Sequence, residues 1–159
     1  MPEKETVERA KRDKRQGKAP TTQAGEFVRE EMHHVREGKH GARSTKQAIA
    51  IGLSKARRSG VELPAPEKGT TSEKTRSSAQ HALKRSRSGR KPSARRASAV
   101  RTALRREGRA AASKSALARQ ARSAARKRGA RSLKAAARKA VRTKGPAGRV
   151  AAARFRGAA

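Results

Sequence analysis

The positive charge of this chain is concentrated in its second half. Lysine and arginine account for 44 of the 159 residues and aspartate and glutamate for 12, which gives a formal net charge of +32. Residues 1–68 include 16 basic and 10 acidic residues, a net charge of +6. Residues 69–159 include the other 28 basic and 2 acidic residues, a net charge of +26. Self-repulsion of this size opposes the formation of one compact domain. The two halves are therefore expected to differ in structure.

Large apolar side chains are scarce, and this limits the size of any core. Aromatic residues make up 1% of the chain, and the hydrophobic 33% includes many alanines. These side chains can close one small unit of two or three helices and no more. We therefore predict a mostly α fold with extensive disorder, in which a small helical hairpin precedes a basic Ala/Arg-rich tail that forms discontinuous helices.

Changes in composition suggest four segments. Residues 1–20 mix acidic and basic side chains around one large apolar residue, Val7, so we expect a flexible N-terminus with a helix that frays. Residues 21–63 contain the apolar positions of the hairpin. Pro64, Pro66 and Gly69 mark residues 64–76 as a linker. Residues 77–159 form the basic tail.

Two amphipathic helices are predicted in residues 21–63. The first begins at an N-cap supplied by Thr21 or Thr22 and ends at Gly38, and the second runs from the capping-box serine Ser44 to Gly60. Gly52, in the middle of the second helix, predicts close backbone approach by the first. The core of this hairpin is small, so we expect marginal stability or self-association. The predicted core residues are Phe27, Val28, Met32, Val35, Ile49 and Leu53.

The unbalanced charge of the tail points to a polyphosphate partner. Lysine and arginine side chains that neutralise phosphates release condensed counterions, which drives binding without regard to base sequence. DNA is the expected partner, and RNA, which is also a polyanion, remains open. The residues predicted to contact phosphate are Arg90, Lys91, Arg95, Arg96, Arg101, Arg105, Arg106, Arg109, Arg126, Lys127, Arg128, Arg138 and Lys139.

Catalysis, cofactors and membrane insertion find no support in the sequence. Without cysteine there are no disulfides or thiolate metal sites, and no nucleophile motif is present. His33, His34 and His40 lie near several glutamates, but adjacent histidines on a helix point about 100° apart and no third ligand at useful spacing is evident, so no metal site is predicted. With no apolar segment of spanning length, we expect a soluble, cytoplasmic, non-enzymatic protein.

The segment FVREEMHHVREG followed by KHGARSTKQAIAIGLSKAR resembles a family of small basic bacterial proteins labelled as plasmid stabilisation proteins or uncharacterised DNA-binding proteins. The resemblance covers roughly Thr22 to Leu63 and implies a bacterial or phage origin and an association with the nucleoid or a plasmid. By composition alone, the tail resembles the basic arms of histone-H1-like bacterial proteins. The expected function is thus histone-like DNA binding and condensation. An RNA-associated structural protein and an adaptor for an acidic protein partner are the alternatives.

Overall fold

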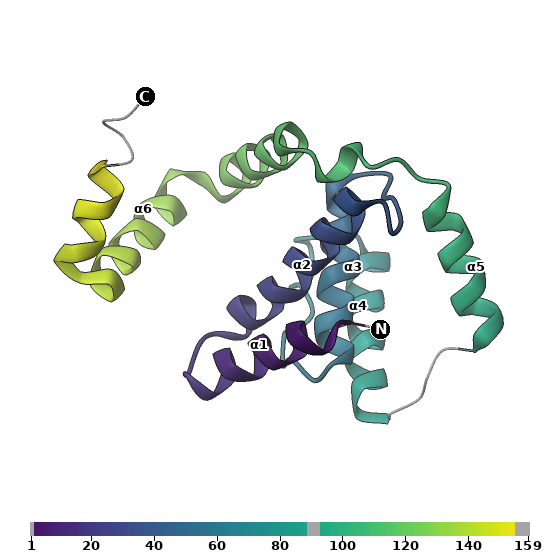
Figure 1. Cartoon of the computed structure of the whole chain (residues 1–159). Helices are drawn as coiled ribbons and strands as arrows, with labels where there is room; N and C mark the ends of the chain where they lie inside the picture. Colours follow the sequence, from purple (N-terminus) through teal and green to yellow (C-terminus); the bar gives the residue numbers. More distant parts are fainter. Residues whose placement is uncertain (1, 89–92, 155–159) are drawn as a thin grey trace. The chain divides into compact units, whose positions relative to one another are not determined.

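The computed structural model of the chain describes residues 2–88 and 93–154, and over these residues it is helical (Figure 1). This confirms the predicted mostly α class and the division of the tail into separate helices. Arg90 and Lys91, two of the predicted phosphate contacts, lie outside the described residues. The elements are α1 (Lys4–Arg15), α2 (Pro20–Glu37), α3 (Thr45–Arg58), α4 (Glu73–Ser88), α5 (Ala94–Arg105), the single 3₁₀ turn η1 (Ala110–Ala112) and α6 (Lys114–Arg154).

Helices α2 and α3 form the predicted hairpin, and three of its four ends match the sequence signals. Gly38 ends α2 in the left-handed conformation, with φ at 77°. The hydroxyl of Ser44 caps α3 by accepting a hydrogen bond from the Gln47 amide, and Gly60 follows the helix with φ at 88°. The predicted threonine N-cap of α2 is wrong: Ala19 occupies that position and Pro20 is the first helical residue. A proline at this position needs no amide partner, and its fixed φ already suits a helix.

Gly52 brings the two helices of the hairpin into backbone contact, as predicted. A Cβ atom on Gly52 would lie 2.7 Å from the Cα of Val28 and 3.0 Å from the carbonyl oxygen of Phe27. On either side of this contact lies a small hydrophobic cluster. Phe27 belongs to one cluster, with Leu53 packed against it, and the second cluster contains Met32 and Val35, with Val28 and Ile49 packed against it.

The N-terminal segment, expected to be flexible, contains a helix that packs against α2. Thr6, Ala10 and Asp13 of α1 are buried, and Ala10 joins the Phe27 cluster with Val7 beside it. The sequence pattern understated this helix because its inner face carries small and polar side chains. A polar contact also joins this helix to α2: Arg9 Nε donates to Glu26 Oε2 over 2.7 Å.

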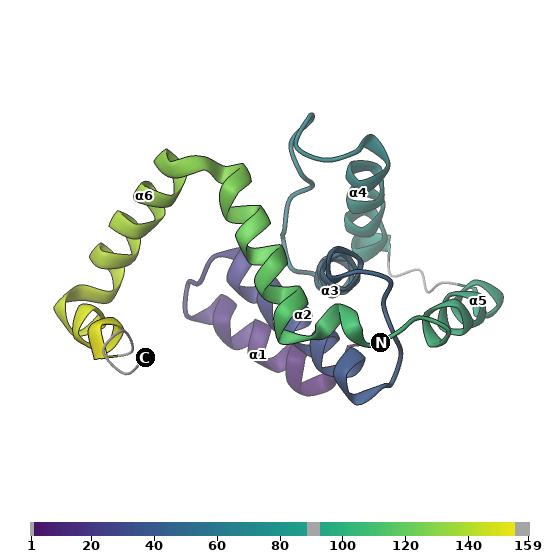
Figure 2. The same ribbon diagram turned by 90° about the horizontal axis from the view of Figure 1, so that it is seen from above.

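Two parts of the basic half also pack on the hairpin. Helix α4 begins inside the predicted linker and lies along α3, which separates it from α2 (Figure 2), with Ala79 and Ala82 buried. The η1 turn packs on α2 and α3, where Ala111 and Ala112 complete the second cluster. Alanine methyl groups are sufficient here because the backbones approach closely.

Backbone hydrogen bonds fasten the segment around η1 to the loop between α2 and α3. The Gly41 amide donates to the Leu104 carbonyl over 2.9 Å, and the Ala42 amide donates to the Gly108 carbonyl over 3.0 Å. The Thr45 hydroxyl donates to the Ala111 carbonyl over 2.7 Å. Met1–Leu117 form one compact unit and Ala118–Ala159 a second. In the second unit, Gly129 of α6 has a left-handed backbone conformation, with φ at 73°.

Candidate functional site

The predicted phosphate contacts that the structure describes are all exposed. Helix α5 contains no buried residue, so its arginines extend into solvent. From residue 74 to the end of the chain the only acid is Glu107, which leaves the basic residues with almost no carboxylate to balance them. The exposed members of the predicted set are Arg95, Arg96, Arg101, Arg105, Arg106, Arg109, Arg126, Lys127, Arg128, Arg138 and Lys139.

One group of bases lines a hollow of about 440 Å³ in the first unit. Arg58 of α3 and Arg85 of α4 line it together with Arg96, and no carboxylate is among its lining residues, which also include Ser54, Ser78 and His81. The pKa of Arg58 is lowered, first by partial removal from water and then by the positive charge of Arg85. Like charges held beside a concave surface with hydroxyl groups favour an anion such as phosphate. Arg96 was among the predicted phosphate contacts, whereas Arg58 and Arg85 were not.

A second basic hollow, of about 280 Å³, lies along α6 in the second unit. It is lined by Arg126 and Lys127, which were predicted, and by Arg119, Arg122 and Ser123, which were not. These residues recur at spacings of three and four, so they share one side of the helix. Because like charges at these spacings repel, an anion bound along this side would stabilise the helix.

In contrast, several exposed bases of the first 68 residues have acidic partners. Lys11 Nζ lies 3.0 Å from Glu8 Oε1, and Lys14 Nζ lies 3.4 Å from Glu62 Oε1. Exposed ion pairs of this kind contribute little to stability, but each cancels a charge that could attract a polyanion. Carboxylates thus pair with several bases near the N-terminus, and Glu73 pairs with Arg76 at the start of α4, whereas the sequence from residue 74 onward contains a single acid for all its bases.

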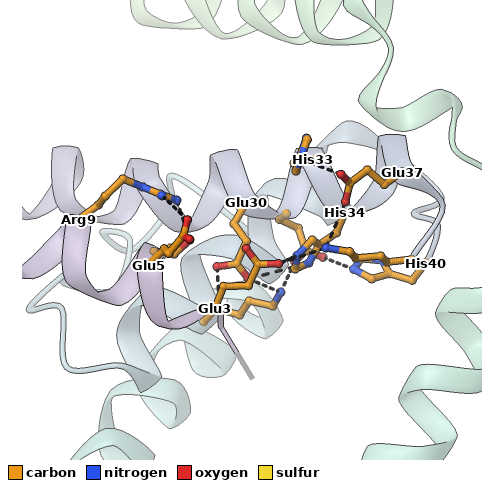
Figure 3. A network of polar contacts seen from close by, with 12 residues as sticks. Glu3, Glu5, Arg9, Glu30, His33, His34, Glu37 and His40 are labelled. Atoms are coloured by element: carbon orange, nitrogen blue, oxygen red, sulfur yellow. Dashed lines mark hydrogen bonds and ion pairs between the residues drawn. The ribbon is translucent and has the colours of Figure 1, made fainter.

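A different group of ionisable side chains is buried between α2, α3 and the loop that joins them (Figure 3). Glu30 and Glu31 of α2 are almost completely inaccessible to solvent, and both face Lys55 of α3, with Glu31 Oε2 2.6 Å and Glu30 Oε1 3.4 Å from its Nζ atom. Two carboxylates against one ammonium group leave an excess of one negative charge. His34 and His40 lie beside these two carboxylates.

The histidines approach the buried carboxylates from two directions. His40 Nε2 lies 3.2 Å from Glu31 Oε1, and His34 Nδ1 lies 3.9 Å from Glu30 Oε1. Ligand atoms of Glu31, His34 and His40 all lie within 4.8 Å of one another. Spacing along a single helix does not indicate this third ligand. The Gly38 turn brings His40 back against α2, and this return is not visible in a helical pattern.

Glu3 closes the outer side of this cluster. His34 Nε2 donates to Glu3 Oε1 over 2.8 Å, and Lys39 Nζ donates to the same oxygen over 3.1 Å. The hydrogen bond from His34, followed by that from Lys39, lowers the pKa of Glu3 from 4.5 to about 2. The pKa of Lys39 is raised by its hydrogen bonds to Glu37 and Glu3. His33 pairs with Glu37 on the exposed side, away from His34.

Comparison with protein families finds a match to a family of unknown function (DUF6496) over residues 4–68. The expected resemblance to plasmid stabilisation or DNA-binding families is therefore wrong: the family found carries no such label, and its match starts at α1 instead of Thr22. The QAIAIGLSKAR motif lies within α3, where its Ala48, Gly52 and Ala56 are buried. Neither the curated proteins nor the solved structures contain a match.

The described residues include no helix that is both long and apolar enough to cross a membrane. The longest, α6, is rich in arginine and lysine.

Proposed function

We propose that the protein binds DNA in a histone-like manner, largely without sequence preference, and condenses it in association with the nucleoid. The observation that carries this proposal is the exposure of the predicted phosphate contacts that the structure describes, in a segment that contains a single acid from residue 74 onward. Each phosphate that they neutralise releases counterions, and the resulting entropy gain favours binding to any phosphate backbone. The scarcity of aromatic side chains disfavours a stacking platform for single strands.

The hollow beside Arg58, Arg85 and Arg96 supports this proposal independently of the tail's overall charge. Burial and then the positive charge of Arg85 lower the pKa of Arg58, against the opposite effect of Glu31, and no carboxylate lines the hollow itself. A phosphate group in the hollow would remove this repulsion and could also accept hydrogen bonds from both guanidinium groups.

The double substitution Arg58→Gln with Arg85→Gln tests the proposal in the full-length protein. If both arginines contact phosphate, the slope of log K against log salt for duplex DNA falls by about 1.8, at roughly 0.9 per contact. Because the substitution removes a repulsive pair, stability should stay unchanged or increase. The matched control, Lys11→Gln with Lys14→Gln, removes two bases that already have acidic partners. Its slope should change much less.

Full-length protein is required for this comparison, because removal of the basic half would also remove α4 and η1 from the core of the first unit. Affinity should be measured for random duplex DNA and for structured RNA at the same salt concentration. Equal loss of slope in the two double variants would contradict the assigned role of the hollow. Preferential binding of RNA would favour an RNA-associated structural protein, and the absence of nucleic-acid binding would overturn the proposal.

A further inference from the structure

We propose that Glu31, His34 and His40 form a binding site for one Zn²⁺ ion, which ties α2 to the loop that follows it. The inference does not depend on nucleic-acid binding. It rests on the hydrogen-bond directions, burial and charge of this cluster.

The hydrogen bonds of the two histidines leave one nitrogen of each ring free to bind a cation. His40 Nδ1 lies 3.1 Å from the Gly41 carbonyl oxygen, which can only accept, so Nδ1 carries a proton and the neutral ring has its lone pair on Nε2. His34 Nε2 lies 2.8 Å from a carboxylate oxygen of Glu3, so Nε2 carries a proton and the neutral ring has its lone pair on Nδ1. Metal-bound histidines characteristically have such a carboxylate or carbonyl behind the second nitrogen.

In the neutral ring this unprotonated nitrogen of His40 lies close to a negative oxygen. Nε2 is 3.2 Å from Glu31 Oε1, and two acceptors at this distance repel each other unless a metal ion or the second proton of an imidazolium ring lies between them. Zinc bonds of about 2.0–2.2 Å at tetrahedral angles put neighbouring ligand atoms about 3.3 Å apart. The observed separation therefore suits two ligands of one ion. His34 needs a small side-chain movement to complete the set, since the three ligand atoms lie within 4.8 Å.

Glu31 supplies a second, independent indication. Its side chain is fully buried, yet neither of its oxygens receives a well-directed hydrogen bond within the described part of the chain, although Lys55 Nζ is 2.6 Å from Oε2. A buried carboxylate without such bonds is costly. Lys55 cancels one charge of the Glu30 and Glu31 pair, and a divalent cation would more than offset the one that remains. Two imidazoles and one carboxylate form a ligand set that zinc commonly adopts.

Zinc titration of the untagged, chelator-treated full-length protein, followed by calorimetry, tests this assignment. We expect one Zn²⁺ per chain and a zinc-dependent rise in the melting temperature. Glu31→Gln and, separately, His40→Ala should weaken binding at least about tenfold and remove the rise. The control variants His33→Ala and His81→Ala remove the two other histidines of the chain and should bind zinc like the parent protein.

Glu31→Gln also separates a metal site from a purely structural role. It removes the excess negative charge of the cluster with little change in shape and leaves Glu30 to pair with Lys55, so without metal the variant should be about as stable as the parent, while its response to zinc is lost. Co²⁺ in place of zinc should give visible absorption bands in the parent and the controls only. Absence of uptake, or uptake that depends on His33, would overturn the proposal. So would an unchanged zinc response in both ligand variants.

Discussion

Substitution of Gly52 by alanine should destabilise the protein, although alanine is the better helix former. In an exposed helix the exchange gains about 1 kcal/mol. Here the new methyl group would meet the Cα of Val28 at 2.7 Å and the carbonyl oxygen of Phe27 at 3.0 Å. Carbon atoms in contact prefer about 3.5–4.0 Å, so α2 and α3 must separate by roughly 1 Å. Overpacking costs about 1–3 kcal/mol, and backbone atoms cannot rotate away, so the upper end applies. The net loss should be about 2 kcal/mol.

Gly25 provides a matched control within the same hairpin. It lies in α2, and a Cβ atom there would have no neighbour within 4 Å, so Gly25→Ala should stabilise the protein by about 1 kcal/mol. Denaturant unfolding of both variants, followed by the ring signals of Phe27, measures the difference of about 3 kcal/mol expected from these two estimates. If Gly52→Ala were as stabilising as Gly25→Ala, the close contact of α2 with α3 would be refuted.

Two further substitutions test the loop between α2 and α3. Gly41→Ala would place its methyl group on the Glu107 carbonyl and should detach the η1 segment. The loss of two hydrogen bonds of about 1 kcal/mol each should then speed hydrogen exchange of the Ala42 amide on the order of 30-fold. Gly108→Ala, where nothing lies within 4 Å, is its control and should leave exchange unchanged. Ser44→Ala removes the cap of α3 and should cost about 1 kcal/mol in denaturant unfolding, whereas Ser44→Asp should retain most of that energy.

Local signals predicted the hairpin because its ends and its contact depend on single residues. Ser44, Gly38 and Gly60 act within one turn of chain, and Gly52 implies a neighbour by having no side chain. The docking of η1 and α4 was not predicted. Their buried surfaces consist of alanine methyl groups such as Ala79, Ala111 and Ala112, and the same residue recurs on exposed faces throughout the tail. An alanine stripe therefore does not distinguish a packed helix from a solvated one.

The candidate site likewise has features that the sequence predicts and features that it does not. Exposure of the tail bases follows from their number, because a small core cannot bury them, and the described members of the predicted set are exposed. The hollow of Arg58 and Arg85 depends on how α4 lies along α3, and the approach of His40 to Glu31 depends on the loop after Gly38. Both arise from contacts between residues that are distant along the chain, which charge counts and helical periodicity do not contain.

The inner face of α2 is more polar than the stability of so small a protein requires. Half of its eight buried residues are polar or charged, among them Glu30, Glu31 and His34. Replacing buried ion pairs with apolar side chains is often neutral or stabilising, and this chain has few large apolar residues with which to build a core. Packing alone would thus favour leucine at position 31. A bound cation changes this balance, because it binds the buried carboxylate only in the folded state and so stabilises that state relative to the unfolded one. The polarity of this face is therefore better explained by a ligand than by the hairpin's own stability.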